Sequence, residues 1–379
     1  MKLRALSSVL AACALAAVAP LAIAARGAAP SPPPGPTARA ADLGPGLACA
    51  AIVARVDDAL ARPEAEIGRA EHDAIFLAVR EGARAGAPAR AEGCGARLYG
   101  RLASVERCGR AADALAAGLF GAAGAAPSEV AAAVRAARPA CRAPIAEAAG
   151  FASDVDASLV AALREVRDRA ARGRDPDGVV EYRVAWLALG SLEETAARSG
   201  RAEVRAELDR EIAGALAEAS GPRELLLLRA AGNGGCVGCL PKVRARLDAR
   251  DATVRRAAAA ALRFVDDADA VRRMCARLAA DADVAVRDTA AWALHAREGS
   301  AAERAACLEL AARRDGEAVV RQQATQSLGL LAYHDEKARD GIVRLVDDPH
   351  PEVASLALGV LRAEGERQGA SDARGAGER

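Results

Sequence analysis

The feature that most constrains this chain is a side-chain pattern that recurs about every 33 residues in its second half. Four valines follow one another at spacings of 32, 34 and 33 residues, and a leucine follows each of them by eight positions. The valines are Val254, Val286, Val320 and Val353, and the leucines are Leu262, Leu294, Leu328 and Leu361. A repeat of this length predicts a hairpin of two helices. One such hairpin cannot bury its apolar faces alone, so the pattern predicts a row of stacked hairpins, an α-α superhelix.

The composition agrees with an all-α fold. Of 379 residues, 52% are hydrophobic and only 2% are aromatic, and the hydrophobic residues are mainly Ala, Leu and Val. This set favours helices, whereas a large antiparallel sheet would use more Thr, Tyr, Ile and Phe. Between successive valines, a second helix is expected over residues 267–280, 301–313 and 335–347.

Charged residues recur in the same register. In the first three copies an acid stands three positions before the valine and an arginine one position after it. These residues are Asp251 and Arg255, Asp283 and Arg287, and Glu317 and Arg321. The fourth copy departs from the pattern, with His350 and Ala354 at these positions. We interpret the arginines as a structural ladder in which these acids are their partners; an anion-binding site is the alternative.

The two-helix period and the Asp-x-x-Val-Arg pattern, followed by Ala-Leu, resemble HEAT repeats over residues 178–365. This resemblance implies an armadillo-type helical solenoid that binds other proteins on an extended surface. Two further segments, residues 186–192 and 226–233, resemble parts of the helical N-terminal region of vitellogenin and lipid-transfer proteins. Those lipid carriers line their lipid cavity with β-sheets, and no β-rich region is expected here.

The first 24 residues are typical of a signal peptide. Lys2 and Arg4 precede an uncharged apolar run, and Ala22-Ile23-Ala24 is a small-x-small cleavage site. A transmembrane anchor is an alternative, although the run is at the short limit for spanning a bilayer. A third alternative is lipidation, because Leu10-Ala11-Ala12-Cys13 resembles the bacterial lipobox. The sequence therefore predicts an exported protein, periplasmic or extracellular, with any membrane attachment made through Cys13.

Cleavage after Ala24 removes two basic residues and leaves 50 basic and 51 acidic ones. A neutral exported chain is a poor candidate for binding nucleic acid, since phosphate neutralisation supplies most of that affinity. A Pro-rich linker is expected over residues 25–46, an irregular helical region over 47–177 and a disordered tail over 366–379. Within the helical region, one helix is expected over 97–117.

Eight of the nine cysteines remain in the mature chain, and an even number in an oxidising compartment permits disulfides. Four of them lie in the N-terminal helical region and allow two bridges in three connectivities: Cys49, Cys94, Cys108 and Cys141. Cys236 and Cys239 form a CxxC, for which we favour a local structural disulfide over a redox pair or half of a zinc site.

Cys275 and Cys307 occupy equivalent positions in neighbouring repeats, 21 residues after their valines. Stacked helices lie about 8–10 Å apart, whereas a disulfide needs Cα atoms closer than about 7 Å. We therefore expect these two cysteines to be unbonded.

The sequence carries no GxxxxGK[ST], HExxH or GxSxG motif. Trp186 and Trp292 stand among Ala and Leu and are expected in the core. The sequence thus favours a non-catalytic protein-binding scaffold without a cofactor or metal. The alternatives are a carrier of a lipid or another apolar ligand and an enzyme that uses the CxxC.

Overall fold

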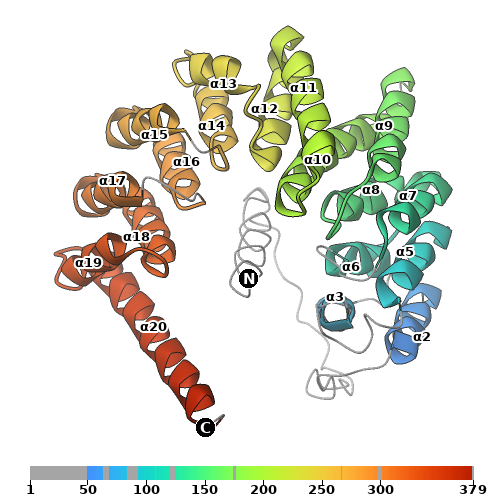
Figure 1. Cartoon of the computed structure of the whole chain (residues 1–379), viewed down its shortest axis with the longest axis horizontal. Helices are drawn as coiled ribbons and strands as arrows, with labels where there is room; N and C mark the ends of the chain where they lie inside the picture. The colour runs from blue at the N-terminus through green and yellow to red at the C-terminus, as the bar shows by residue number, and fades with distance from the viewer. Residues whose placement is uncertain are drawn as a thin grey trace, which may run out of the picture. The chain divides into compact units, whose positions relative to one another are not determined.

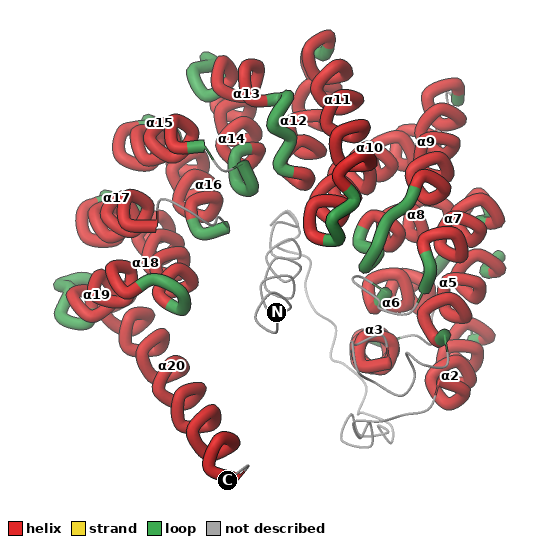
Figure 2. Tube along the Cα trace, in the orientation of Figure 1, coloured by secondary structure: helices red, strands yellow, loops and turns green. Residues whose placement is uncertain are grey.

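A computed structural model describes residues 49–62, 68–82, 93–106, 108–119, 125–173, 176–265, 267–296 and 301–377. Within these ranges it contains 18 α-helices and one short 3₁₀ turn and no β-strand (Figure 2). The all-α fold predicted from the sequence is therefore confirmed. The signal peptide over 1–24, with Cys13, and the linker over 25–46 lie outside the described residues. No helix in the described part is both long enough and apolar enough to cross a bilayer.

The chain divides into two compact units, Met1–Arg205 and Ala206–Arg379. The helices of the N-terminal unit form two rows, in which each helix contacts the next helix of its own row and its neighbour along the chain (Figure 1). One row is α2 (Cys49–Ala61), α5 (Cys94–Ser104), α7 (Pro127–Ala136) and α9 (Ala157–Arg172). The other row is α3 (Arg69–Gly82), α6 (Arg110–Gly118), α8 (Arg142–Gly150) and α10 (Pro176–Arg198). Hairpins are thus stacked in this region as well.

The helix expected over 97–117 is two helices, α5 and α6. The chain leaves the helix after Ser104, and Gly109 stands in extended conformation immediately before α6. Apolar residues continue at helical spacing across the break, with Leu102 and Leu115 both buried, so the periodicity alone did not reveal it.

The C-terminal unit repeats the two-row arrangement (Figure 1). We call the row that carries the repeated valines the valine row. It consists of α12 (Gly221–Gly234), α14 (Ala252–Ala261), α16 (Val284–Leu294), α18 (Ala318–Ala332) and α20 (Pro351–Gly377). The second row consists of α13 (Leu240–Arg246), α15 (Ala268–Ala280), α17 (Ala301–Arg314) and α19 (Glu336–Leu345). Helix α11 (Ala202–Glu218) precedes both rows.

Six of the eight repeated apolar residues lie in the core of this unit, and Val254 and Leu361 are half-buried. Val286, Val320 and Val353 are fully buried, and so are Leu262, Leu294 and Leu328. Burial of each such side chain contributes roughly 1.5–3 kcal/mol. The predicted second helices at 267–280, 301–313 and 335–347 correspond to α15, α17 and α19. Helix α20 continues to Gly377, so the tail expected to be disordered from residue 366 is helical through that residue.

Two glycines allow close approach between helices, one in each unit. A Cβ atom on Gly150 in α8 would lie 2.7 Å from the Cα of Ala188 in α10. A Cβ atom on Gly232 in α12 would lie 2.8 Å from the Cα of Ala261 in α14. Since real Cβ contacts are longer, these helix pairs can come this close only through glycine.

Candidate protein-binding surface

The repeated arginines form rungs that join one turn of the C-terminal unit to the next. Arg255 on α14 donates from Nε and Nη2 to both carboxylate oxygens of Asp281, in the turn between α15 and α16, at 2.8 Å each. Arg287 on α16 makes the same fork to Asp315, in the turn between α17 and α18, at 2.8 and 3.0 Å. Such bidentate pairs are the strongest ion pairs that side chains make.

Each arginine also binds the turn that precedes its own helix. Arg287 donates from Nη1 to the carbonyl oxygen of Asp281 at 2.8 Å, and Arg321 donates to that of Asp315 at 2.9 Å. Asp281 and Asp315 are therefore each held twice: the carboxylate by the preceding helix of the valine row and the carbonyl by the following one. We call this chain of contacts the arginine ladder.

The expected acid partners were wrong. Asp251 and Asp283 accept hydrogen bonds from the backbone N–H groups of Thr253 and Val286 at 2.7 and 3.1 Å, which caps α14 and α16. Glu317 stands at the same position before α18 without a side-chain cap bond. An acid at a helix N-cap is held by backbone donors and points along its own helix, so the arginines hydrogen-bond to other carboxylates. Its charge still acts on them at longer range.

The acids of these turns carry a sequence signal of their own, separate from the acids at the helix caps. Asp281, Asp315 and Asp348 recur at spacings of 34 and 33 residues. Each stands two positions before a helix cap residue. Its carboxylate accepts a hydrogen bond from the backbone N–H of that cap residue at 2.9–3.0 Å. A second acid in the same repeat register was therefore visible in the sequence.

The last rung departs from this arrangement. Arg321 on α18 donates from Nε to Oε1 of Glu352 on α20 at 3.1 Å, and its Nη2 donates to the same oxygen. Asp348, which the register would assign to Arg321, has an ion pair with Arg313 at 3.8 Å instead.

The rungs shift the pKa of their members. Burial alone would raise the pKa of the Asp281 carboxyl. The hydrogen bonds from Arg255 and from the Asp283 N–H, together with the nearby guanidinium charges, more than offset burial and lower this pKa below its usual value. The hydrogen bond that Arg255 donates to Asp281 is the largest cause that raises the pKa of Arg255. Both groups stay charged at neutral pH, as a structural rung requires.

Cys275 on α15 and Cys307 on α17 form a disulfide with a Cα–Cα distance of 5.7 Å, so the expectation that they are unbonded was wrong. That expectation used the distance between helix axes. Cα atoms lie about 2.3 Å from the axis, so on facing sides of two stacked helices they come several ångströms closer than the axes do. The bridge adds a covalent link within the second row.

The other six cysteines of the described residues form three disulfides. Cys49 pairs with Cys94 and Cys108 with Cys141, which selects one of the three connectivities that the sequence allowed. Cys236 pairs with Cys239 in the turn before α13, and both are buried. A disulfide sulfur is not a thiolate ligand, which disfavours the half zinc site.

The tryptophans lie within the helix packing. Trp186 is buried on α10, with the Arg167 guanidinium 4.8 Å from its ring centre. Trp292 on α16 is partly buried, and the guanidinium of Arg263 lies 5.3 Å from its ring centre. His295, one turn further on, lies edge to face with Trp292. Burial is the main cause that lowers the pKa of His295 to about 4.

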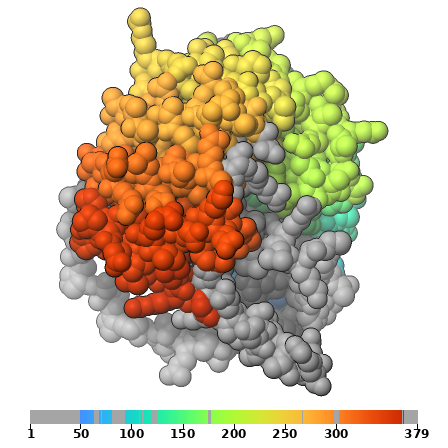
Figure 3. Space-filling view, turned by 60° about the vertical axis from the view of Figure 1, so that its left-hand side comes forward, coloured from blue at the N-terminus to red at the C-terminus, as the bar shows by residue number. Residues whose placement is uncertain are grey.

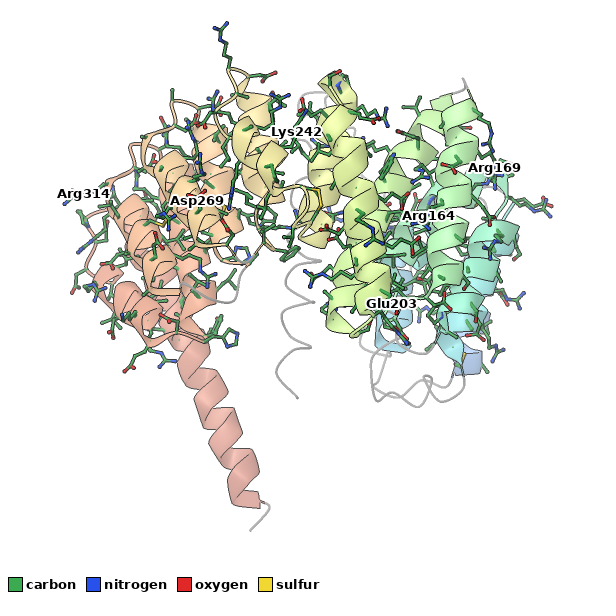
Figure 4. All side chains as sticks on the ribbon, turned by 45° about the horizontal axis from the view of Figure 1, so that its top comes forward. Arg164, Arg169, Glu203, Lys242, Asp269 and Arg314 are labelled. Carbon is green, nitrogen blue, oxygen red and sulfur yellow. A yellow bond between two sulfur atoms is a disulfide. The ribbon has the colours of Figure 1, made fainter. Side chains whose placement is uncertain are left out.

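A groove runs along α17 in the second row of the C-terminal unit, whose surface Figure 3 shows in orange and red. It consists of two cavities of about 250 and 410 Å³ that share Ala306 and Glu309. Glu309 accepts a forked hydrogen bond from Arg344 on α19 at 2.8 and 2.7 Å. The groove is further lined by Ala302, Ala305, Leu310, Arg313, Arg314, Lys337, Asp340, Asp348 and Pro349. We call it the α17 groove; Arg314, one of its lining residues, is labelled in Figure 4.

Both apolar and charged side chains are available there. Leu310 is 47% exposed on α17. Three small side chains line the groove, of which Ala302 and Ala306 are exposed and Ala305 is buried. The α17 groove therefore offers an apolar contact beside charged groups, the combination that protein interfaces use.

Comparison with known proteins agrees with this architecture. Residues 240–329, from α13 into α18, match the family model for HEAT repeats. The fold is thus an α-α superhelix that contains HEAT-like hairpins. HEAT repeats were predicted over residues 178–365. Outside the matched residues 240–329, they remain a prediction.

Two solved structures match most of the chain at low sequence identity. An engineered protein is 16% identical, with a TM-score of 0.34, over 85% of this chain and 92% of that one. A chain of the Pds5–Scc1 complex is 13% identical, with a TM-score of 0.30, over 81% of this chain and 56% of that one. No curated protein matches. These comparisons lend no support to the resemblance to vitellogenin.

Proposed function

We propose that this protein is an exported, non-catalytic scaffold that binds a protein partner on the HEAT-like stack of its C-terminal unit. The observation that carries the proposal is the α17 groove, where an exposed leucine lies beside alanines and paired charges. The Cys275–Cys307 bridge and the Arg287–Asp315 rung hold α17, and the fork from Arg344 to Glu309 joins α19 to it, so little ordering entropy would be lost on binding.

Export is supported by the cysteines. Four disulfides in one chain are typical of an oxidising compartment, because cytosolic reductants keep thiols reduced. The mass of the mature N-terminus tests this part of the proposal. Cleavage after Ala24 would support a released protein, and an acylated Cys13 would support an anchored lipoprotein. A chain that retains residues 1–24 without acylation would contradict export by either route.

The binding role is tested by cross-linking in the cells that make the protein. A photoreactive amino acid replaces Leu310 in the α17 groove, and a matched chain carries it at Arg272, an exposed position on α15. We expect one defined protein adduct from position 310 and none from position 272. We also expect Leu310→Asp to abolish co-purification of that protein. Equal labelling from both positions would contradict the proposal, as would substrate turnover that a point substitution abolishes.

A carrier of an apolar ligand was the alternative function. The walls of the α17 groove carry Glu309, Arg313, Lys337 and Arg344, which suits a polar protein surface better than a lipid chain. Extraction of the purified protein followed by mass spectrometry separates the two roles, because a carrier would contain a stoichiometric lipid.

A further inference from the structure

The arginine ladder ends at an acid that lacks its arginine. Asp281 and Asp315 each accept a forked guanidinium from the preceding helix of the valine row. Asp348 lies in the equivalent turn, between α19 and α20, and its Oδ1 accepts the His350 N–H at 3.0 Å as in the other two turns. The arginine that the register assigns to it, Arg321, is bonded to Glu352 instead.

The carboxylate of Asp348 is left incompletely bonded in a buried place. Its side chain is 1% exposed, and its Oδ2 has no hydrogen-bond partner among the described residues. The Nε of Arg313 lies 3.8 Å from that oxygen, which is too long for a hydrogen bond. A buried carboxylate oxygen without a donor costs free energy, so a donor that reached it would gain an unusually favourable contact.

The following helix cannot supply the missing donor. In the two complete turns, the arginine six residues after the aspartate binds the aspartate carbonyl. Six residues after Asp348 stands Ala354, whose side chain has no hydrogen-bond donor. Both kinds of ladder contact, the one to the carboxylate and the one to the carbonyl, are therefore missing at Asp348 among the described residues.

Asp348 also lines the larger cavity of the α17 groove, about 410 Å³ in volume, together with Leu310 and Arg313. The side chain of Arg313 is 46% exposed and has only long ion pairs, at 3.7 Å to Glu309 and 3.8 Å to Asp348. Glu309 does not depend on it, because Arg344 already holds that carboxylate. Arg313 can therefore swing away at little cost and open the way from the groove to Asp348.

We propose that Asp348 binds an arginine side chain of the protein partner, which completes the ladder from outside. A planar guanidinium fits because it makes the same forked contact that Arg255 and Arg287 make inside the molecule. Residues beside that arginine in the partner would cover Leu310. The inference rests on the proposed protein-binding function and names the group that the α17 groove recognises.

The test measures binding of a fluorescent pentapeptide, Ala-Leu-Arg-Leu-Ala, to the mature chain by anisotropy. Two further peptides carry citrulline, which is neutral and of the same shape, or lysine in place of the arginine. We expect the arginine peptide to bind, the citrulline peptide to bind at least about tenfold more weakly, and the lysine peptide to fall between them. Equal binding of the arginine and citrulline peptides would overturn the proposal, and so would no binding of the arginine peptide at millimolar concentration.

Three variants locate the site. Asp348→Asn keeps an oxygen that can accept the His350 N–H but loses the charge, and we expect it to weaken arginine-peptide binding at least about tenfold. Asp347→Asn, at the exposed neighbouring position, is the matched control and should leave binding unchanged. Arg313→Gln removes the covering side chain and should strengthen binding by about threefold, an effect that a purely structural role of Asp348 would not produce.

Unchanged binding to Asp348→Asn would overturn the proposal, and so would weaker binding to Arg313→Gln. The outcome is separable from that for the scaffold function. If the partner cross-linked from position 310 were captured equally by wild type and Asp348→Asn, the scaffold would stand and the arginine site would fall.

Discussion

The two units of this chain hold helical hairpins together with different bonds. In the N-terminal unit, Cys49–Cys94 joins α2 to α5, and Cys108–Cys141 joins the start of α6 to the start of α8. In the C-terminal unit, forked arginine–carboxylate pairs repeat from turn to turn, and one disulfide joins α15 to α17. The N-terminal unit also has ion pairs between its elements, Arg142 with Glu181 and a fork from Arg201 to Asp154, but they follow no repeat. The comparison teaches that the same two-row stack can be secured with scattered links or with a periodic ladder of charges.

Removal of both N-terminal bridges should have the largest effect. Each closes a loop of 45 or 33 residues, and loss of each should cost about 2–4 kcal/mol of unfolding free energy. Replacing all four cysteines by alanine should abolish hydrogen-exchange protection across α2–α9 and leave α12–α19 protected. The control replaces Cys236 and Cys239 by alanine, because their bridge closes a far shorter loop. Equal loss in both units would break the comparison.

Arg287→Ala should destabilise the C-terminal unit by about 3–5 kcal/mol, because it leaves the buried carboxylate of Asp315 without its partner. Arg314→Ala, at an exposed position of α17, should change stability by less than about 0.5 kcal/mol. Urea unfolding of the full chain measures both. If the two substitutions cost the same, the ladder would not be what holds this unit.

His295 should make the C-terminal unit sensitive to mild acid. Burial, followed by the charges of Arg263 and Arg304, holds its pKa at about 4, below the unfolded value of 6.5. The unfolded chain therefore binds the proton first, and stability that is full above pH 6.5 is lost as the pH falls towards 4. The loss should reach up to about 3 kcal/mol, at about 1.4 kcal/mol per pKa unit.

His295→Gln should flatten this slope. Asp281 does not interfere, because its pKa lies below its usual value and its contribution is lost only at lower pH. Thermal unfolding between pH 7 and pH 4 measures the slope. A slope that persists in the glutamine variant would contradict the assignment.

Gly150→Ala and Gly232→Ala should each destabilise their own unit by about 1–3 kcal/mol, since the added methyl group meets backbone of the facing helix. This prediction sharpens the comparison, because the packing within each row should be alike even though the bonds differ. Gly100→Ala and Gly214→Ala place the methyl group in open space within helices and should stabilise by about 0.5–1 kcal/mol. A stabilising change at Gly232 would contradict the close approach.

The sequence showed the C-terminal stack because its supports are periodic. Val286, Val320 and Val353 recur in register, and the same residues are the buried core. The ladder arginines were found in the same way. The two-row packing of the N-terminal unit was not predicted, because its cysteines follow no repeat. The positions of Cys49, Cys94, Cys108 and Cys141 in the sequence also do not show which of them are bonded to each other.

The remaining errors have geometric causes. Sequence spacing says which residues share a turn, but not that Asp283 points along its helix while Asp281 faces Arg255. It also gives no distance between facing Cα atoms, which decided the pairing of Cys275 with Cys307. Whether Asp348 receives an arginine depends on the partner of Arg321, and the sequence does not show that this partner is Glu352.

Arg255 and Arg287 each bind the acid of the next turn and not the acid at the next helix cap. A double-mutant cycle on Arg287 measures this choice directly, with Asp315→Asn as one arm and Glu317→Gln as the other. We expect a coupling energy of about 2 kcal/mol between Arg287 and Asp315 and less than about 0.5 kcal/mol between Arg287 and Glu317. Stronger coupling to Glu317 than to Asp315 would contradict it.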